Sequence, residues 1–139
     1  MLVFWDTNLF IYLWEDSTAT ARVEKLSAWQ RRERAEVATS TLTVGEILVH
    51  PLRQARADVA NVYRDIFSQL RVIPYDLDAA LLFAQLRADH PALKSPDAIQ
   101  LACAAVASVD LFVTNDRRLS RFKPAAVGKI QSLADFAGR

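Results

Sequence analysis

The sequence predicts a three-layer α/β/α domain with a central, mainly parallel sheet of four to five strands. Three observations predict this class: short apolar runs alternate with helical patterns, the first run contains no polar residue, and 52% of the 139 residues are hydrophobic. A strand without polar residues is buried on both faces, as in a parallel sheet that helices cover on both sides. A chain of this length fills one core, so we expect residues 1–139 to form a single domain.

The first elements are predicted from an apolar run and from helical periodicity. Residues 2–5 form the first strand, and Asp6 ends it. A short helix over residues 9–14 follows. Large apolar side chains recur at helical spacing among charged residues over 17–35, which predicts an amphipathic helix, and residues 37–40 form a second strand.

The next two helices are predicted from a capping pattern and from an apolar face. Thr43 and Glu46 have the spacing of a capping box, in which each side chain bonds a free backbone amide at a helix start. We therefore expect a helix over residues 41–49 that ends before Pro51. Residues 53–70 place their large apolar side chains on one face and predict a longer helix.

The second half of the chain continues the alternation. Ser95, Pro96 and Asp97 have the order of an N-cap, a first helical position and a first turn, and that helix continues to Ser108. Residues 111–114 are the clearest strand. The other predicted elements are a strand over 71–75, a helix over 76–88 capped by Asp76 or Asp78, a helical turn over 117–122, a strand over 129–131 and a helix over 133–137.

Composition limits the function classes. The net charge of +1 neither indicates nor excludes nucleic-acid binding, so phosphate contacts must come from local groups of arginines. The only cysteine, Cys103, cannot form an intramolecular disulfide, and the first residues lack the pattern of a secretory signal, which together predict a cytoplasmic protein. The longest apolar stretch, residues 98–109, is too short to span a bilayer, so we expect no membrane association.

Four acidic residues lie in four separate segments: Asp6, Glu46, Asp97 and Asp116. Asp6 and Asp116 follow strands, whereas Glu46 and Asp97 lie in first turns of helices. All four could therefore meet at the carboxyl edge of a parallel sheet, where ligands bind in such folds. Helix N-termini favour negative charge, so Glu46 and Asp97 should stay ionised. Carboxylates gathered in this way suit a hard divalent cation such as Mg²⁺ or Mn²⁺.

Each acid also has an ordinary explanation when it is taken alone. Glu46 could only close its capping box, Asp97 could only complement a helix dipole, and Asp116 could only shape the turn after its strand. Asp6 could cap the following helix with its neighbours, although an unpaired charge at the end of a buried strand is costly. The functional interpretation requires that the four carboxylates meet in space.

Four motifs in order resemble the PIN-domain nucleases, in particular the toxin ribonucleases of VapBC-type toxin–antitoxin modules. They are FWDTN at residues 4–8, STLT at 40–43 with Glu46, SPDAI at 95–99 and VTNDRRL at 113–119. The resemblance covers nearly the whole chain. It implies a PIN-like α/β fold and a metal-dependent endoribonuclease that hydrolyses RNA phosphodiester bonds.

The resemblance also implies roles for individual residues. Asp6, Glu46, Asp97 and Asp116 would hold one or two Mg²⁺ or Mn²⁺ ions. Asp6 and Asp97 would be primary ligands, Glu46 a ligand or the residue that orients the attacking water, and Asp116 a ligand that acts through water or on a second ion. The supporting residues would be Asn8 and Thr114, and the residues along the RNA backbone would be Arg117, Arg118, Arg121 and Lys123.

Partners and aromatic surfaces follow in the same way. The resemblance implies a homodimer and a cognate, VapB-like antitoxin that blocks the acidic site. Trp5 and Phe10 are expected in the core, while Trp14 suits either the core or base stacking. His50 and His90 lie beside prolines, and we expect both to be structural or solvent-facing.

Two other functions remain open at this stage. A catalytically inactive PIN-like module that binds RNA or protein would be expected to lack one or more of the four acids, and all four are present. A phosphotransfer domain that uses Asp6 as nucleophile would need a second aspartate close to the first, where Asn8 stands, and a lysine late in the chain. Lys123 and Lys129 have no supporting motif.

Overall fold

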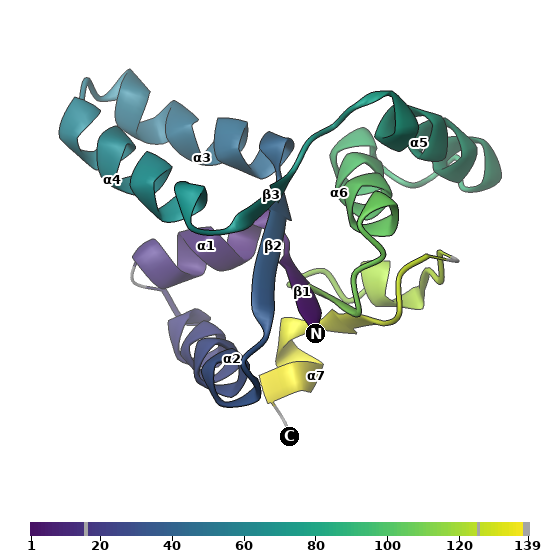
Figure 1. Cartoon of the computed structure of the whole chain (residues 1–139), viewed down its shortest axis with the longest axis horizontal. Coiled ribbons are helices and arrows are strands. Elements are labelled where there is room, and N and C mark those ends of the chain that lie inside the picture. The colour runs from purple at the N-terminus through teal and green to yellow at the C-terminus, as the bar shows by residue number, and fades with distance from the viewer. Residues whose placement is uncertain (16, 125, 138–139) are drawn as a thin grey trace.

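A central sheet of five strands, all parallel, organises the chain in a computed structural model that describes residues 1–15, 17–124 and 126–137. Its order is β3-β2-β1-β4-β5, so the first strand lies in the middle (Figure 1). This confirms the predicted class, with the sheet fully parallel. The strands are β1 (Leu2–Trp5), β2 (Glu36–Ser40), β3 (Arg71–Ile73), β4 (Leu111–Thr114) and β5 (Ile130–Ser132).

Helices cover both faces of this sheet (Figure 1). One face packs against α5 and α6, and the other packs against α1, α2, α4 and α7, while α3 leaves the end of β2 and pairs with α4. The helices are α1 (Thr7–Trp14), α2 (Thr20–Glu33), α3 (Thr41–Arg53), α4 (Ala57–Ser68), α5 (Leu77–Asp89), α6 (Ser95–Val106), a 3₁₀ turn η1 (Leu119–Arg121) and α7 (Leu133–Ala137).

The side chains of β1 alternate between two hydrophobic cores. Leu2 and Phe4 face the α5–α6 side, and Phe4 stacks on Phe112 with ring centroids 4.9 Å apart. Val3 and Trp5 face the opposite side. All four β1 residues are buried, as the run without polar residues predicted.

Several element boundaries differ from the sequence prediction. Helix α3 does not end before Pro51 but runs to Arg53, and Pro51 is buried inside it. Proline removes the hydrogen bond to the carbonyl four residues earlier, here that of Ile47, and burial of its ring offsets this loss. The chain leaves the helix at Gln54 and Ala55, whose φ of 53° is left-handed, so α4 begins later than the predicted residue 53.

Two helix caps were also assigned wrongly. The N-cap of α3 is Ser40, whose hydroxyl accepts a hydrogen bond from the Thr43 amide, so Thr43 and Glu46 do not form a capping box. The N-cap of α6 is Lys94 rather than Ser95, and no side chain bonds the helix end. Because Thr43 and Glu46 form no capping box, their side chains are free for contacts elsewhere.

The register of the sheet places three strand ends at one level. Trp5 lies opposite Val113, and the Asp6 amide donates to the Val113 carbonyl at 3.1 Å, which brings Asp6 beside Thr114. Phe4 lies opposite Ala38, so Ser40 lies on the other side of Asp6. The chain leaves β1 and β4 toward opposite sides of the sheet, and ligand sites in open α/β sheets lie at such a switch point. Among the described residues, no helix is both long and apolar enough to cross a membrane.

Candidate active site

Asp6 lies at the centre of the carboxyl edge and is the N-cap of α1. Its Oδ1 atom accepts hydrogen bonds from the Thr7 amide at 2.8 Å and from Gln100 Nε2 at 3.2 Å. Its Oδ2 atom accepts one from the Thr114 hydroxyl at 2.8 Å. Burial raises the pKa of the Asp6 carboxyl, against the lowering effect of these hydrogen bonds, and the charge of Asp116 raises it further. Keeping a charge here costs free energy unless a cation compensates it.

Asp97 lies in the first turn of α6 and is half-buried. Burial raises the pKa of its carboxyl, and the charges of Asp6 and Asp116 raise it further, while Lys94 and Arg118 oppose them. The helix end was expected to favour the charged form of Asp97, and the net shift of its pKa is nevertheless upward. Burial and the like charges of Asp6 and Asp116 outweigh the helix end here, so Asp97 lies within electrostatic reach of both other aspartates.

Asp116 follows β4 and is bound by its neighbour Arg118. The guanidinium donates to both carboxylate oxygens, at 3.2 Å and 3.0 Å, and the Arg118 amide donates to Oδ1 at 2.9 Å. These bonds hold the pKa of the Asp116 carboxyl below its usual range. The Asp116 amide in turn donates to the Thr114 hydroxyl at 3.1 Å, which links this turn to Asp6. Arg118, expected along the RNA, is thus engaged with an acid of the site.

Glu46 is exposed on α3 and is linked to Asp6 only indirectly. Its Oε1 atom accepts a hydrogen bond from the Thr7 hydroxyl at 3.1 Å. It also lines a cavity of about 450 Å³ between α1, α3 and α4, together with Trp14, His50 and Tyr63. Its role in the structure is therefore not the cap that its spacing suggested.

Four polar residues that the sequence analysis did not assign to the site connect the acids. Gln100, Thr7, Thr43 and Ser40 are buried and form hydrogen bonds with one another. One signal could have identified Gln100: it stands three residues after Asp97 in an otherwise apolar stretch, so it lies on the same helix face. Thr43 was interpreted as part of a capping box, and Thr7 appeared within the FWDTN motif.

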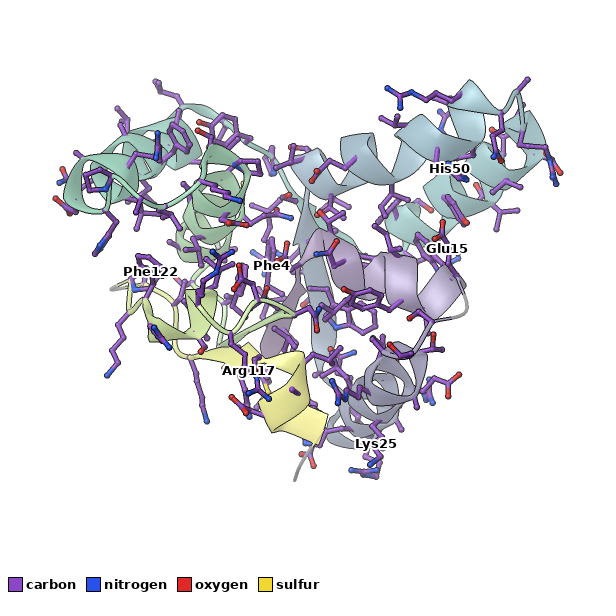
Figure 2. The ribbon with its side chains drawn as sticks, turned by 180° about the vertical axis from the view of Figure 1, so that it is seen from behind. Phe4, Glu15, Lys25, His50, Arg117 and Phe122 are labelled. Carbon is purple, nitrogen blue, oxygen red and sulfur yellow. The ribbon has the colours of Figure 1, made fainter. Side chains whose placement is uncertain are left out.

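The remaining predicted site residues surround this centre. Thr114 is fully buried and contacts Asp6, as described above, whereas Asn8 is exposed in the first turn of α1. Arg117, Arg121 and Lys123 are exposed after β4. Figure 2 shows Phe122, in the segment of these basic residues, and His50 of α3 on opposite sides of the molecule. The basic segment therefore lies on the Asp97 side of the site, away from the cavity beside Glu46.

Aromatic residues and histidines agree with their predicted places. Trp5 and Phe10 are buried in the core, and half-buried Trp14 stacks on Tyr63 with centroids 4.4 Å apart. His50 and His90 are exposed.

A cleft of about 190 Å³ opens on the acids beside Lys94, Arg118 and Phe122, and Asp97 and Asp116 line it. In the part of the chain that the structure describes, no three acidic, histidine or cysteine side chains already stand close enough to form a complete metal site. The donor set nevertheless suits a hard divalent cation. Asp6 Oδ2 accepts a single hydrogen bond, and the Asp97 carboxylate accepts none from the described residues, so both retain free lone pairs.

Comparison with known proteins agrees with this architecture. Similar solved structures include DNA-bound VapBC from Salmonella typhimurium, with 20% identity, a TM-score of 0.72 and coverage of 96% of this chain and 99% of that chain. A toxin–antitoxin complex from Klebsiella pneumoniae shows 25% identity, a TM-score of 0.68 and coverage of 90% and 94%. VapBC2 from Rickettsia felis, bound to a promoter DNA fragment, shows 17% identity, a TM-score of 0.71 and coverage of 95% and 98%.

No curated protein matches the chain by sequence. The family model of the PIN domain, however, matches residues 3–123, a range that contains Asp6, Glu46, Asp97 and Asp116. Because this model spans most of the chain and the fold agrees with it, the chain belongs to the PIN domain family.

Proposed function

We propose that this protein is a metal-dependent endoribonuclease that acts as the toxin of a toxin–antitoxin pair. Membership of the PIN domain family implies nuclease activity in general. The observation that carries the finer proposal is the electrostatic coupling of Asp6, Asp97 and Asp116 at the switch point of the sheet. The charge of Asp116 raises the pKa of Asp6 and of Asp97, and the charge of Asp6 raises that of Asp97, so a divalent cation would stabilise this group of carboxylates.

The roles of the acids follow from their positions. Asp6 and Asp97 would hold Mg²⁺ or Mn²⁺ through their free lone pairs. A bound divalent ion supplies charge neutralisation on the phosphodiester and a water of lowered pKa. Glu46 would be a ligand or would orient the water that attacks the phosphate. Asp116 would act through water or toward a second ion, since Arg118 already occupies both of its oxygens.

The supporting and RNA-binding residues complete the proposal. Thr114 holds Oδ2 of Asp6 in place, and Asn8 would assist from the first turn of α1, the helix that Asp6 caps. Exposed Arg117, Arg121 and Lys123 would track the RNA backbone next to the cleft. Arg118 would contribute there if phosphate replaced Asp116 as its partner.

Partners and location are proposed from the relatives. The similar structures are toxin–antitoxin complexes, so we propose a VapB-like antitoxin as a partner in the cytoplasm. We also propose that residues 1–139 act as one nuclease domain and associate as a homodimer.

A catalytically inactive PIN-like module that binds RNA or protein is the second candidate. The bidentate bond of Arg118 to Asp116 favours it, because a carboxylate neutralised by arginine is a poorer metal ligand. The two candidates differ in whether divalent ions support RNA cleavage.

The test is cleavage of a mixed single-stranded RNA by purified protein with Mg²⁺ or Mn²⁺. Asp97→Asn should lower cleavage by at least about 100-fold, since it removes a charge from the metal-binding donor set, and a chelator should stop the wild type. Asp78→Asn is the matched control, because Asp78 is likewise an acid in the first turn of a helix, α5, but is exposed and lies outside the predicted site. Equal cleavage by wild type and Asp97→Asn, or cleavage in chelator, would refute the nuclease assignment.

A further inference from the structure

We propose that Gln100 is a positioning residue that orients two of the catalytic carboxylates at once, Asp6 directly and Glu46 through the hydroxyls of Thr43 and Thr7. This inference rests on the proposed nuclease function and adds a residue and a mechanism of alignment to it.

Gln100 connects four elements that meet at the carboxyl edge. It stands on α6, one turn after Asp97, and it is 2% exposed. Its Nε2 atom lies 3.2 Å from Asp6 Oδ1, 3.0 Å from Thr7 Oγ1 and 2.8 Å from Thr43 Oγ1. Its Oε1 atom accepts a hydrogen bond from the hydroxyl of Ser40 at the end of β2. One amide therefore ties α6 to β2, to the end of β1, and to the helices α1 and α3.

The protons of this network can point in only one direction. Thr7 donates its single hydroxyl proton to Glu46 Oε1, so in the 2.9 Å contact between the two threonines Thr43 must donate and Thr7 must accept. The proton of Thr43 is then used, so Gln100 must donate to Thr43. Ser40 donates to the other end of the amide. The hydrogen bonds run from Ser40 through Gln100 and Thr43 to Thr7 and Glu46, and Gln100 also contacts Thr7 directly.

The second proton of the amide is shared between Asp6 Oδ1 at 3.2 Å and Thr7 Oγ1 at 3.0 Å. A neutral donor can satisfy a buried carboxylate oxygen without neutralising it, whereas a lysine or arginine here would compete with a cation. Together with the Thr7 amide on the same oxygen and the Thr114 hydroxyl on the other, Gln100 fixes the plane of the Asp6 carboxylate. The Oδ2 atom is left with one free lone pair for a metal.

A purely structural role explains the Glu46 end of this chain poorly. Glu46 is exposed, so water could solvate its carboxylate, and fixing an exposed side chain costs conformational entropy for little gain in stability. The hydrogen bonds of Gln100, Thr43 and Thr7 end on this exposed acid and fix its position relative to Gln100, which also bonds Asp6. Such alignment of a catalytic group is what outer-shell hydrogen bonds do at metal sites.

The test compares three variants, each of which keeps the approximate shape of the side chain that it replaces. Gln100→Met keeps the length of the side chain but removes the amide. Thr43→Val removes one hydroxyl and leaves Thr7, the partner of Glu46, with only the direct 3.0 Å bond from Gln100. Thr39→Val is the matched control, because Thr39 is a fully buried threonine of β2 whose hydroxyl bonds the Trp5 carbonyl at 2.9 Å and touches neither acid.

Mn²⁺ binding is measured by calorimetry, and RNA cleavage is measured at saturating Mn²⁺. Gln100→Met should weaken Mn²⁺ binding and lower kcat, each by about 10- to 100-fold, and Thr43→Val should lower kcat by about 10-fold. Thr39→Val should match the wild type in both. Adding Thr43→Val to Gln100→Met should cost little more, because the two groups act as one unit. Thr43→Val removes only one hydroxyl, so it carries the test if Gln100→Met does not fold.

The outcomes separate this inference from the function on which it rests. The nuclease assignment stands if the wild type binds Mn²⁺ and cleaves RNA while Asp97→Asn does neither. If, in that case, Gln100→Met and Thr43→Val both behave like Thr39→Val, the positioning role is wrong. If the wild type neither binds Mn²⁺ nor cleaves RNA, both are overturned. Additive losses in the double variant would show that Gln100 and Thr43 act separately, which also contradicts the proposal.

Discussion

At the scale of single residues, the site is defined by a conflict between burial and charge. Asp6 is 8% exposed, and three hydrogen bonds do not prevent burial from raising the pKa of its carboxyl. Residues that are held in an unfavourable state by their surroundings often serve function at the expense of stability. Replacing Asp6 by a neutral side chain should therefore raise stability and lower activity.

Asp6→Asn should raise the thermal stability of the metal-free protein at neutral pH while it abolishes RNA cleavage. Asparagine can keep the contacts, because its oxygen can accept from Thr7 and Gln100 and its amide can donate to Thr114. Since folding raises the pKa of Asp6 above 3.8, the folded wild type binds its proton more tightly than the unfolded chain does. Wild-type stability from this group is thus present below pH 3.8 and is lost as the pH rises through the folded pKa.

The measurement is thermal unfolding of both proteins in chelator between about pH 4 and pH 8, a range that spans the titration of a carboxyl with a raised pKa. The advantage of Asp6→Asn should be largest at the alkaline end and should shrink toward acid pH, where the wild-type carboxyl is neutral. An asparagine variant that is less stable than the wild type at the alkaline end would show that the carboxylate is not strained in the folded state.

The sequence identified the residues that end strands but not those that connect them. Asp6 and Asp116 interrupt apolar runs, and that contrast is visible without coordinates. Gln100 is visible only as one polar residue in an apolar helix, and its partners Ser40 and Thr43 lie 60 and 57 positions away in the sequence. Hydrogen bonds of this kind depend on the register between strands, which local patterns do not contain.

At the scale of elements, strands were predicted more accurately than helix ends. The bounds of β1 and β4 agree with the prediction because an apolar run ends at a polar residue in both. The start of α3 at residue 41 was predicted correctly, but its cap was not, because Ser40 and Thr43 can both cap a helix. Its end was wrong because burial of Pro51 compensates for the missing amide. Tertiary packing decided where local preference left a choice.

Two glycines should respond oppositely to the same substitution. Gly45 lies in α3, and no atom lies within 4 Å of the place that an added methyl group would take, so Gly45→Ala should stabilise the protein by up to about 1 kcal/mol through helix propensity. A methyl group on Gly128, just before β5, would lie 2.5 Å from the Asp110 carbonyl oxygen. Because that oxygen belongs to the backbone and cannot easily move aside, Gly128→Ala should destabilise by about 1–3 kcal/mol.

Urea unfolding of the two alanine variants beside the wild type measures both effects. Gly45→Ala and Gly128→Ala serve as controls for each other, since each adds a single methyl group to the chain. A stable Gly128→Ala variant would mean that the turn before β5 shifts freely, contrary to the close approach of Gly128 to Asp110.

At the scale of the whole molecule, the fold class was predictable and the closeness of the acids was not. Alternating strands and helices are sufficient to predict a covered parallel sheet, and such a sheet brings its strand ends to one edge. Whether carboxylates at that edge form a ready ligand cluster depends on side-chain partners such as Arg118 on Asp116. The sequence was therefore sufficient to predict which edge of the sheet carries the acids, whereas the hydrogen bonds and ion pairs of their side chains were found only in the structure.

The proposed metal site should couple ion binding to the stability of the entire fold. Its ligands come from the end of β1 and the start of α6, ninety-one positions apart in the sequence (Asp6 to Asp97), so the unfolded chain has no comparable site. Mn²⁺ at about 100 times its dissociation constant should stabilise the folded wild type by about 2.7 kcal/mol. Asp97→Asn should lose this gain, and Asp78→Asn should keep it. Thermal unfolding of the three proteins with and without Mn²⁺ checks this, and an equal gain in Asp97→Asn would place the bound ion away from the edge of β1 and β4.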